Sequence, residues 1–195
     1  MKRLLIPTIL CVTYLVFGVG ATSAKKKPEK PIQEQFEATI SPMISPRSMT
    51  IAIEEFSTND EMQAIAQAFA KGGEDAVESS MRKIKKGYYQ IERGEVMPIE
   101  LIQLKSAAGV RSLGIVGEAS DRFQGTSPDK VFIGHRGYPY TFIEIEVDQQ
   151  GNGKGLMIPF AKLVFNKQGQ MVVEPMEVGT GIHASFQLIN VHWTK

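Results

Sequence analysis

From about residue 36 to the C-terminus, apolar and polar residues alternate in short runs that are separated by Gly, Pro, Asn and Asp. The clearest run is residues 140–148, in which Thr141, Ile143, Ile145 and Val147 share one face. A period of two is typical of a strand with one buried face. Comparable runs predict strands at residues 48–56, 97–105, 110–116, 131–134, 140–148, 156–165, 170–178 and 186–194.

One stretch after residue 56 has the spacing of helices instead. Thr58 and Glu61 have the pattern of a capping box, and the apolar residues that follow recur at intervals of three and four. The pair Gly72-Gly73 predicts the end of this helix, and we expect a second helix from about Glu74 to Lys86. The two helices share an apolar face that should lie on the sheet, made of Met62, Ile65, Ala66, Phe69, Val77, Met81 and Ile84.

The connections between the later strands indicate their direction. They are too short for a parallel return, which needs a crossover of about a dozen residues. We therefore predict an α+β fold, in which an antiparallel β-meander, open or curled toward a barrel, carries one helical hairpin inserted after the second strand. Residues 36–195 show no internal repeat and no boundary, so we expect a single domain there.

The N-terminal part of the chain has another composition. A basic start, a mostly apolar run over Leu4–Gly20 and small residues at Ala21–Ala24 predict that residues 1–24 are a cleaved signal peptide. An uncleaved anchor is the alternative, favoured by Lys25–Lys27, and it would be the protein's only link to a membrane. Residues 25–35 are charged and contain Pro, as in a flexible linker. We expect export to the periplasm or the exterior.

Composition narrows the function classes. The chain is 43% hydrophobic and 22% charged, values typical of a globular protein and unlike those of disordered or multi-span membrane proteins. Its 22 Lys and Arg residues are balanced by 21 Asp and Glu residues, so no nucleic-acid partner is expected. The single cysteine, Cys11, lies in the signal segment, and a processed chain would be cysteine-free, without disulfides or thiolate metal sites.

Several short segments match known binding or catalytic motifs but lack the helix, companion motif or ligand residue that each motif requires. Residues 179–184 match the dinucleotide pattern GxGxxG/A, but a strand follows where a helix is required. Ser80–Lys83 and Ser127–Lys130 match SxxK without the companion SDN and KTG elements. Asp148–Gly153 resembles the start of a calcium loop, yet Pro159 stands where that loop needs Glu, so we predict a hairpin turn. We assign no cofactor and no catalytic residue.

The histidines do not predict a metal site. His183 and His192 lie on a loop and a strand, without the i, i+4 spacing of a helical metal pair, and His135 is far from both in sequence. His192 is expected on the solvent face of the last strand.

One loop combines polar and aromatic residues more densely than any other. It contains His135, Arg136, Tyr138 and Tyr140, and it follows Asp121 and Arg122. An imidazole, guanidinium groups and phenols suit an anionic or sugar-like ligand, so these six residues are our candidate ligand-binding site. No nucleophile stands in an identifiable relation to His135, which favours binding over catalysis.

Short segments of the chain also form a familiar combination. They are Phe36–Ala38, the helix start at Ser57-Thr58, Tyr138–Glu144 with the Gly-rich turn after Asp148, and Leu188–Val191. Together they resemble a loosely defined group of secreted bacterial proteins of unknown function, over about residues 36–195. The resemblance implies export and a single domain, and it supplies no catalytic residues.

These observations lead to an expected function and two alternatives. We expect a non-enzymatic exported module that binds a small ligand or a partner in the cell envelope. The alternatives are a hydrolase acting on the envelope, with His135 as general base, and an accessory subunit of an envelope complex.

Overall fold

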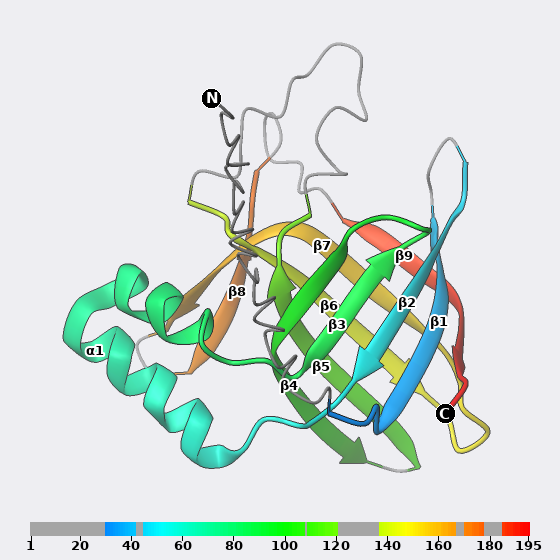
Figure 1. The fold of residues 1–195 in the computed structure, drawn as a ribbon, viewed down its shortest axis with the longest axis horizontal. Helices are drawn as coiled ribbons and strands as arrows, with labels where there is room; N and C mark the ends of the chain where they lie inside the picture. Colours follow the sequence, from blue (N-terminus) through cyan, green and yellow to red (C-terminus); the bar gives the residue numbers. More distant parts are fainter. Residues whose placement is uncertain (1–29, 42–44, 108, 121–136, 167–169, 178–184) are drawn as a thin grey trace, which may run out of the picture.

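A computed structural model describes residues 30–41, 45–107, 109–120, 137–166, 170–177 and 185–195. This part of the chain forms strands with one helix inserted after the second strand (Figure 1). The elements are β1 (Glu34–Ser41), β2 (Arg47–Ile53), α1 (Asn59–Met81), β3 (Gly87–Ile91), β4 (Val96–Ala107), β5 (Val110–Glu118), β6 (Tyr140–Val147), β7 (Asn152–Phe165), β8 (Met171–Pro175) and β9 (Phe186–Trp193).

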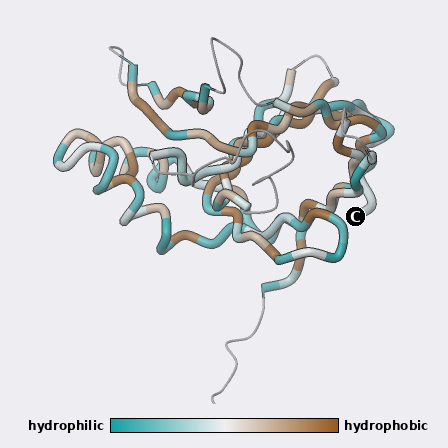
Figure 2. Tube along the Cα trace, turned by 90° about the horizontal axis from the view of Figure 1, so that it is seen from above, coloured by the Kyte–Doolittle hydropathy of each residue, from teal (hydrophilic) through white to brown (hydrophobic). Residues whose placement is uncertain are grey.

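Eight of the strands form a closed antiparallel barrel. Neighbouring strands follow the order β6-β5-β4-β3-β2-β1-β9-β7, and β7 pairs with β6 to close the ring. The long strand β7 pairs with β9 through its first half and with β8 through its second half. Figure 2, seen from above, shows the ring with the helix beside it. The predicted antiparallel α+β fold is confirmed, and the sheet closes completely instead of remaining open.

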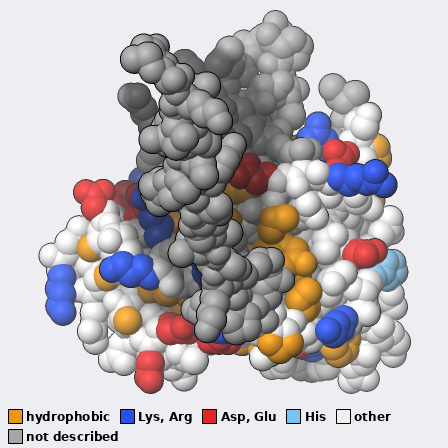
Figure 3. Space-filling model, viewed as in Figure 1, with side chains coloured by type: hydrophobic (Ala, Val, Ile, Leu, Met, Phe, Trp, Pro, Cys, Tyr) orange, Lys and Arg blue, Asp and Glu red, His pale blue; other side chains and the backbone are white. Residues whose placement is uncertain are grey.

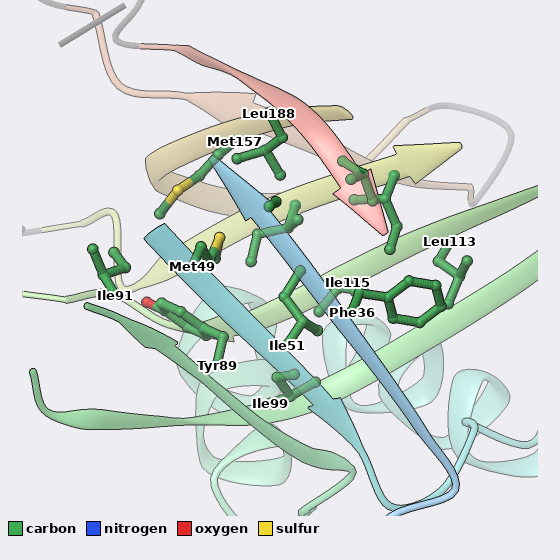
Figure 4. Close-up of a cluster of buried hydrophobic side chains, with 14 of the residues drawn as sticks. Phe36, Met49, Ile51, Tyr89, Ile91, Ile99, Leu113, Ile115, Met157 and Leu188 are labelled. Atoms are coloured by element: carbon green, nitrogen blue, oxygen red, sulfur yellow. The ribbon is translucent and has the colours of Figure 1, made fainter. Parts of the chain in front are cut away.

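The barrel interior is a packed hydrophobic core. Side chains from all eight strands meet there, including Phe36, Ile51, Ile115 and Leu188 (Figure 4). An eight-stranded barrel is just wide enough for side chains to fill it. The predicted alternation in β6 is confirmed, because the residues from Thr141 to Val147 on its inner face are buried.

The predicted capping box at the start of α1 is confirmed, and so is the predicted break between two helical segments at Gly72-Gly73. The Thr58 N–H donates to a carboxylate oxygen of Glu61 at 2.8 Å, and the Glu61 N–H donates to the Thr58 hydroxyl at 3.2 Å. The element α1 consists of two helical segments that meet at Gly73, where φ is 65° and ψ is −150°, and the second segment ends at Met81. That conformation is almost confined to glycine, so the helix changes direction there without a connecting loop.

The expected helix end at Lys86 is wrong. Beyond Met81 the chain turns, and the Lys86 N–H donates to the carbonyl oxygen of Ile99 at 2.8 Å, which starts the approach to β3. The Lys86 side chain is only 2% exposed, and its Nζ lies 2.7 Å from both Glu55 and Glu61. Burial alone would lower the pKa of Lys86, but these two hydrogen bonds raise it above its ordinary value.

Helix α1 covers part of the outer wall of the barrel. A second hydrophobic cluster joins Ile65, Val77 and Met81 of the helix to outward-facing residues of the barrel such as Leu101 and Leu163. The rings of Phe69 and Phe165 also pack together, with centroids 4.5 Å apart. The prediction that the apolar helix face lies on the sheet is confirmed.

Strand β1 begins at Glu34 and so includes the last residues of the segment expected to be a linker. Lys30, also in that segment, forms an ion pair with Glu55. The expected strand at 131–134 and the expected signal peptide lie outside the described residues. In the part of the chain that the structure describes, no helix has both the length and the apolar character needed to cross a bilayer.

Candidate functional site

A cavity of about 880 Å³ lies between the C-terminal segment of α1 and the outside of the barrel. We call it the helix–barrel cavity. Its volume falls in the range usual for small-molecule sites. Its described lining comprises Glu78, Arg82, Ile84 and Lys85 from the end of α1 and the segment after it, Glu95, Met97, Pro98 and Glu100 from β4 and the turn before it, Glu118 and Ala119 from the end of β5, and Gly137, Pro139 and Tyr140 from the start of β6.

A β-bulge in β4 brings Glu100 to the cavity. Ile99 lies opposite Gly117 of β5, whereas Leu101 lies opposite Val116, so Glu100 is an extra residue between the two pairs. The extra residue interrupts the alternation of the strand, because Ile99 contributes to the barrel core and Leu101 contacts the helix. Bulges commonly redirect a side chain in this way. Here the bulge places a carboxylate within an otherwise apolar stretch of β4.

Glu100 is a buried carboxyl group without a complete set of partners. Its side chain is 5% exposed, and its Oε2 has no hydrogen-bond partner among the described residues. Burial raises the pKa of Glu100 to about 7, and the negative charges of Glu118 and Glu78 contribute in the same direction, while Arg82 opposes them. Glu100 is therefore divided between its neutral and charged forms near neutral pH.

Tyr140 places a second unpartnered polar atom in the same cavity. It is also 5% exposed, and its hydroxyl has no hydrogen-bond partner among the described residues. Burial raises the pKa of Tyr140, and the charges of Glu100 and Glu78 raise it further. The phenol therefore stays protonated and remains available as a hydrogen-bond donor.

The outer part of the cavity carries the charged groups that reach solvent. Glu78 and Arg82 form an ion pair one helical turn apart, and the Arg82 side chain is 73% exposed. Glu118 and Lys85 are also exposed. On the face drawn in Figure 3, basic side chains are interspersed with acidic ones over the described surface. The lining of the cavity thus combines charged, exposed side chains with the buried side chains of Glu100 and Tyr140.

This arrangement is suited to binding. Buried polar groups are usually hydrogen-bonded, and an unpaired one costs about 1–3 kcal/mol. A ligand that supplied hydrogen bonds to Glu100 and Tyr140 would recover this free energy. The described lining contains no Ser, Thr, Cys or His, and within the described residues no group of His, Cys, Asp and Glu could hold a metal ion.

The structure places two of the six predicted site residues. Tyr140 lines the helix–barrel cavity, as described above. Tyr138 is partly buried against the barrel core, and the Lys162 ammonium lies 5.7 Å from its ring centroid, so its side chain serves packing. The other four predicted residues, His135, Arg136, Asp121 and Arg122, lie outside the described residues.

Sequence reasoning missed Glu100, Glu78, Arg82 and Glu118. One signal for Glu100 was present, because a single Glu interrupts the apolar run Ile99–Ile102. The others have no local signal, since charged residues at the end of a helix or strand are most often solvated.

The remaining motif predictions have separate outcomes. The hairpin turn after β6 is confirmed, and Asp148 Oδ1 accepts from the N–H groups of Gln150 and Asn152, at 2.9 Å each. His192 is exposed as expected, and its Nδ1 lies 2.9 Å from Asn152 Oδ1. The residues 179–184, with His183, lie outside the described part.

Comparisons of the chain with protein-family models, with curated proteins and with solved structures find no match in any of the three.

Proposed function

We propose that this protein is a non-enzymatic exported module that binds a small molecule in the helix–barrel cavity. The observation that carries the proposal is the pair of buried, unpartnered polar atoms, Glu100 Oε2 and the Tyr140 hydroxyl, on two residues that line a cavity of about 880 Å³. A ligand that satisfied both atoms would gain hydrogen bonds that the free protein lacks.

The position of the cavity supports the same proposal. Side chains pack the barrel core, whereas the cavity between α1 and the wall has room for a ligand. Rigid elements form this space on both sides, because α1 is held to the wall by the cluster around Ile65 and Met81. A site formed by packed elements is already shaped for its ligand, which lowers the entropic cost of binding.

A screen by thermal shift tests the binding proposal. The full chain is mixed with a library of amines, sugars, amino acids and carboxylates, and a hit is expected to raise the melting temperature. The stabilisation should shrink in Glu100→Gln and in Tyr140→Phe. Glu144→Gln and Tyr88→Phe are matched controls outside the cavity lining and should respond like the parent protein. A hit that stabilises all five proteins equally would place the binding site elsewhere.

Export is part of the proposal and rests on residues 1–24, whose basic start, apolar run and small residues have the order of a signal peptide. Intact mass of protein from the cell envelope should show that these residues have been removed. Recovery of the full mass in the membrane fraction would favour the uncleaved anchor.

A hydrolase is the second candidate, favoured by the raised pKa of Glu100. A carboxyl group with a pKa of about 7 has the acidity of a general acid that works at neutral pH. This places the acid at Glu100 instead of His135. Turnover of envelope-derived substrates that disappears in Glu100→Gln and persists in Glu144→Gln would favour the enzyme over the binding module.

A further inference from the structure

The described lining of the helix–barrel cavity contains more acidic than basic side chains. Its described lining carries four carboxyl groups, on Glu78, Glu95, Glu100 and Glu118, and two cationic groups, on Arg82 and Lys85. The guanidinium of Arg82 already pairs with Glu78, and Lys85 is exposed. No cation from the described residues hydrogen-bonds to the buried Oε2 of Glu100.

The two buried polar atoms define what a ligand must supply. Oε2 of Glu100 needs a hydrogen-bond donor, and a positively charged donor would also offset the cost of burying its charge. The Tyr140 hydroxyl can accept a second hydrogen bond through its oxygen. An ammonium group has several N–H donors and a positive charge, so it suits both the carboxylate oxygen and the phenol oxygen. An anionic ligand would instead be repelled by the carboxylates.

The rest of the lining is apolar and indicates the shape of the ligand. Ile84, Met97 and Pro98 line the cavity together with Ala119 and Pro139. These side chains offer contact surface without hydrogen-bonding groups, which suits an aliphatic or aromatic body. The lining is therefore complementary to a molecule that has an apolar part and a cationic end.

We infer that the ligand of the helix–barrel cavity is an amphipathic amine whose ammonium group pairs with Glu100 and Tyr140 and whose apolar part lies against Ile84, Met97 and Pro98. The inference rests on the proposed binding function and specifies its ligand class. Amine binding requires the charged form of Glu100, so affinity should rise as pH increases through about 7. The charged and titratable groups that face Glu100 around the cavity are Glu78, Arg82, Lys85, Glu95, Glu118 and Tyr140.

Three probes of similar shape test the inference on the full chain: phenethylamine, 2-phenylethanol and 3-phenylpropionate. Affinities are measured by calorimetry and by NMR titration at about pH 6 and about pH 8, on either side of the Glu100 transition. We expect phenethylamine to bind about 10-fold more tightly than 2-phenylethanol at the higher pH, and 3-phenylpropionate to bind most weakly. The preference for the amine should decrease at the lower pH.

Substitutions test which residues cause the preference for phenethylamine over 2-phenylethanol. Glu100→Gln should reduce phenethylamine affinity about 10- to 100-fold and abolish its pH dependence, while leaving 2-phenylethanol nearly unchanged. Glu144→Gln, on the exposed face of β6, should behave like the parent protein. Glu118→Gln is an independent test if Glu100→Gln fails to fold, and it should weaken amine binding about 2- to 3-fold by removing one negative charge from the lining.

Several results would overturn the inference. Equal affinity for the amine and the alcohol would show a cavity that binds ligands without selecting ammonium groups, so the proposed function would stand and the ligand class would fall. Unchanged amine binding in both Glu100→Gln and Glu118→Gln would place the amine elsewhere. Failure of phenethylamine to bind up to about 10 mM, with a different hit from the thermal screen, would also reject the amine class while retaining the binding function.

Discussion

The Nζ of Lys86 lies 2.7 Å from a carboxylate oxygen of Glu61, and this ion pair joins the first turn of α1 to the segment that leads into β3. Glu61 also completes the capping box with Thr58, so one carboxylate stabilises the helix start and holds it against the barrel. Lys86 contacts Glu55 at the same distance, which gives the buried ammonium two anionic partners. The contacts fix where α1 begins relative to the sheet.

Replacing this ammonium should destabilise the fold. Lys86→Met keeps most of the aliphatic volume and removes both ion pairs, and we expect a loss of about 1–3 kcal/mol, since both partners remain partly solvated. Lys162→Met is the matched control, because Lys162 pairs with Glu174 at 3.0 Å nearer the surface, and it should lose at most about 1 kcal/mol. Urea unfolding measures the free energy of unfolding of both variants. Equal losses would show that burial adds nothing to the Lys86 pairs.

Glu100 should make stability depend on pH in an unusual direction. Its pKa of about 7 in the folded protein exceeds the ordinary value of 4.5, so the folded state binds more protons between these pH values. The contribution of Glu100 to the free energy of unfolding therefore falls as pH rises from about 4.5 to about 7, and it is constant above pH 7. Glu100→Gln should match the parent near pH 4 and be more stable by up to about 3 kcal/mol near pH 8.

The difference between variant and parent is the quantity to measure, since other carboxylates act in the opposite sense. Hydrogen bonds from Lys30, and to a smaller extent from Lys86, lower the pKa of Glu55 to about 2. The contribution of Glu55 to the free energy of unfolding is therefore lost as pH falls toward 2. A constant difference for Glu100→Gln would mean that its carboxyl group is solvated.

Packing of α1 on the wall should be measurable at two positions. Ile65 is 1% exposed, and Ile65→Ala should lose about 3 kcal/mol. Phe69 is only partly buried, so Phe69→Ala should lose about 2–3 kcal/mol, below the range for a fully buried ring. Gln63→Ala, at an exposed position of the helix, should stay within about 0.5 kcal/mol of the parent. A loss below about 1 kcal/mol at Ile65, measured by chemical denaturation, would mean that the helix does not pack there.

The break in α1 should require glycine. A Cβ at Gly73 would meet no atom within 4 Å, so Gly73→Ala tests backbone strain alone. We expect a loss of about 1–3 kcal/mol by thermal or urea unfolding. Gly114→Ala, whose Cβ would make an ordinary contact with Phe142, is the control and should lose less than about 1 kcal/mol. Increased stability of Gly73→Ala would indicate that the helix can run straight through this position.

Local patterns were sufficient to predict much of the fold. The alternation from Thr141 to Val147 predicts which side of β6 is buried. The spacing of Thr58 and Glu61 predicts the hydrogen bonds of a capping box within one helical turn. Both are encoded in adjacent residues. Closure of the barrel is not, because it depends on the pairing of β9 with β1 and with β7, strands that are distant from β9 in the sequence.

The site was harder to predict for the same reason. Strict alternation would place Ile99 and Leu101 on one face of β4 and Glu100 and Ile102 on the other. Pairing with β5 inserts a bulge instead, and Ile99 and Ile102 both enter the core. Lys86 shows the same limit, since its sequence position suits an exposed helix end, and it is buried because Glu55 and Glu61 reach it from elsewhere.

The pairing of β1 with β9 determines the order of events when the chain is made. The Thr194 N–H donates to the Gln35 carbonyl oxygen at 2.9 Å, and the Gln35 N–H donates to the Lys195 carbonyl oxygen at 3.0 Å, so the ring is joined by its first and last strands. Contacts so distant in sequence form slowly. A growing chain cannot complete the barrel until β9 has left the ribosome. Until then, the incomplete sheet has unpaired edges that need protection from other chains.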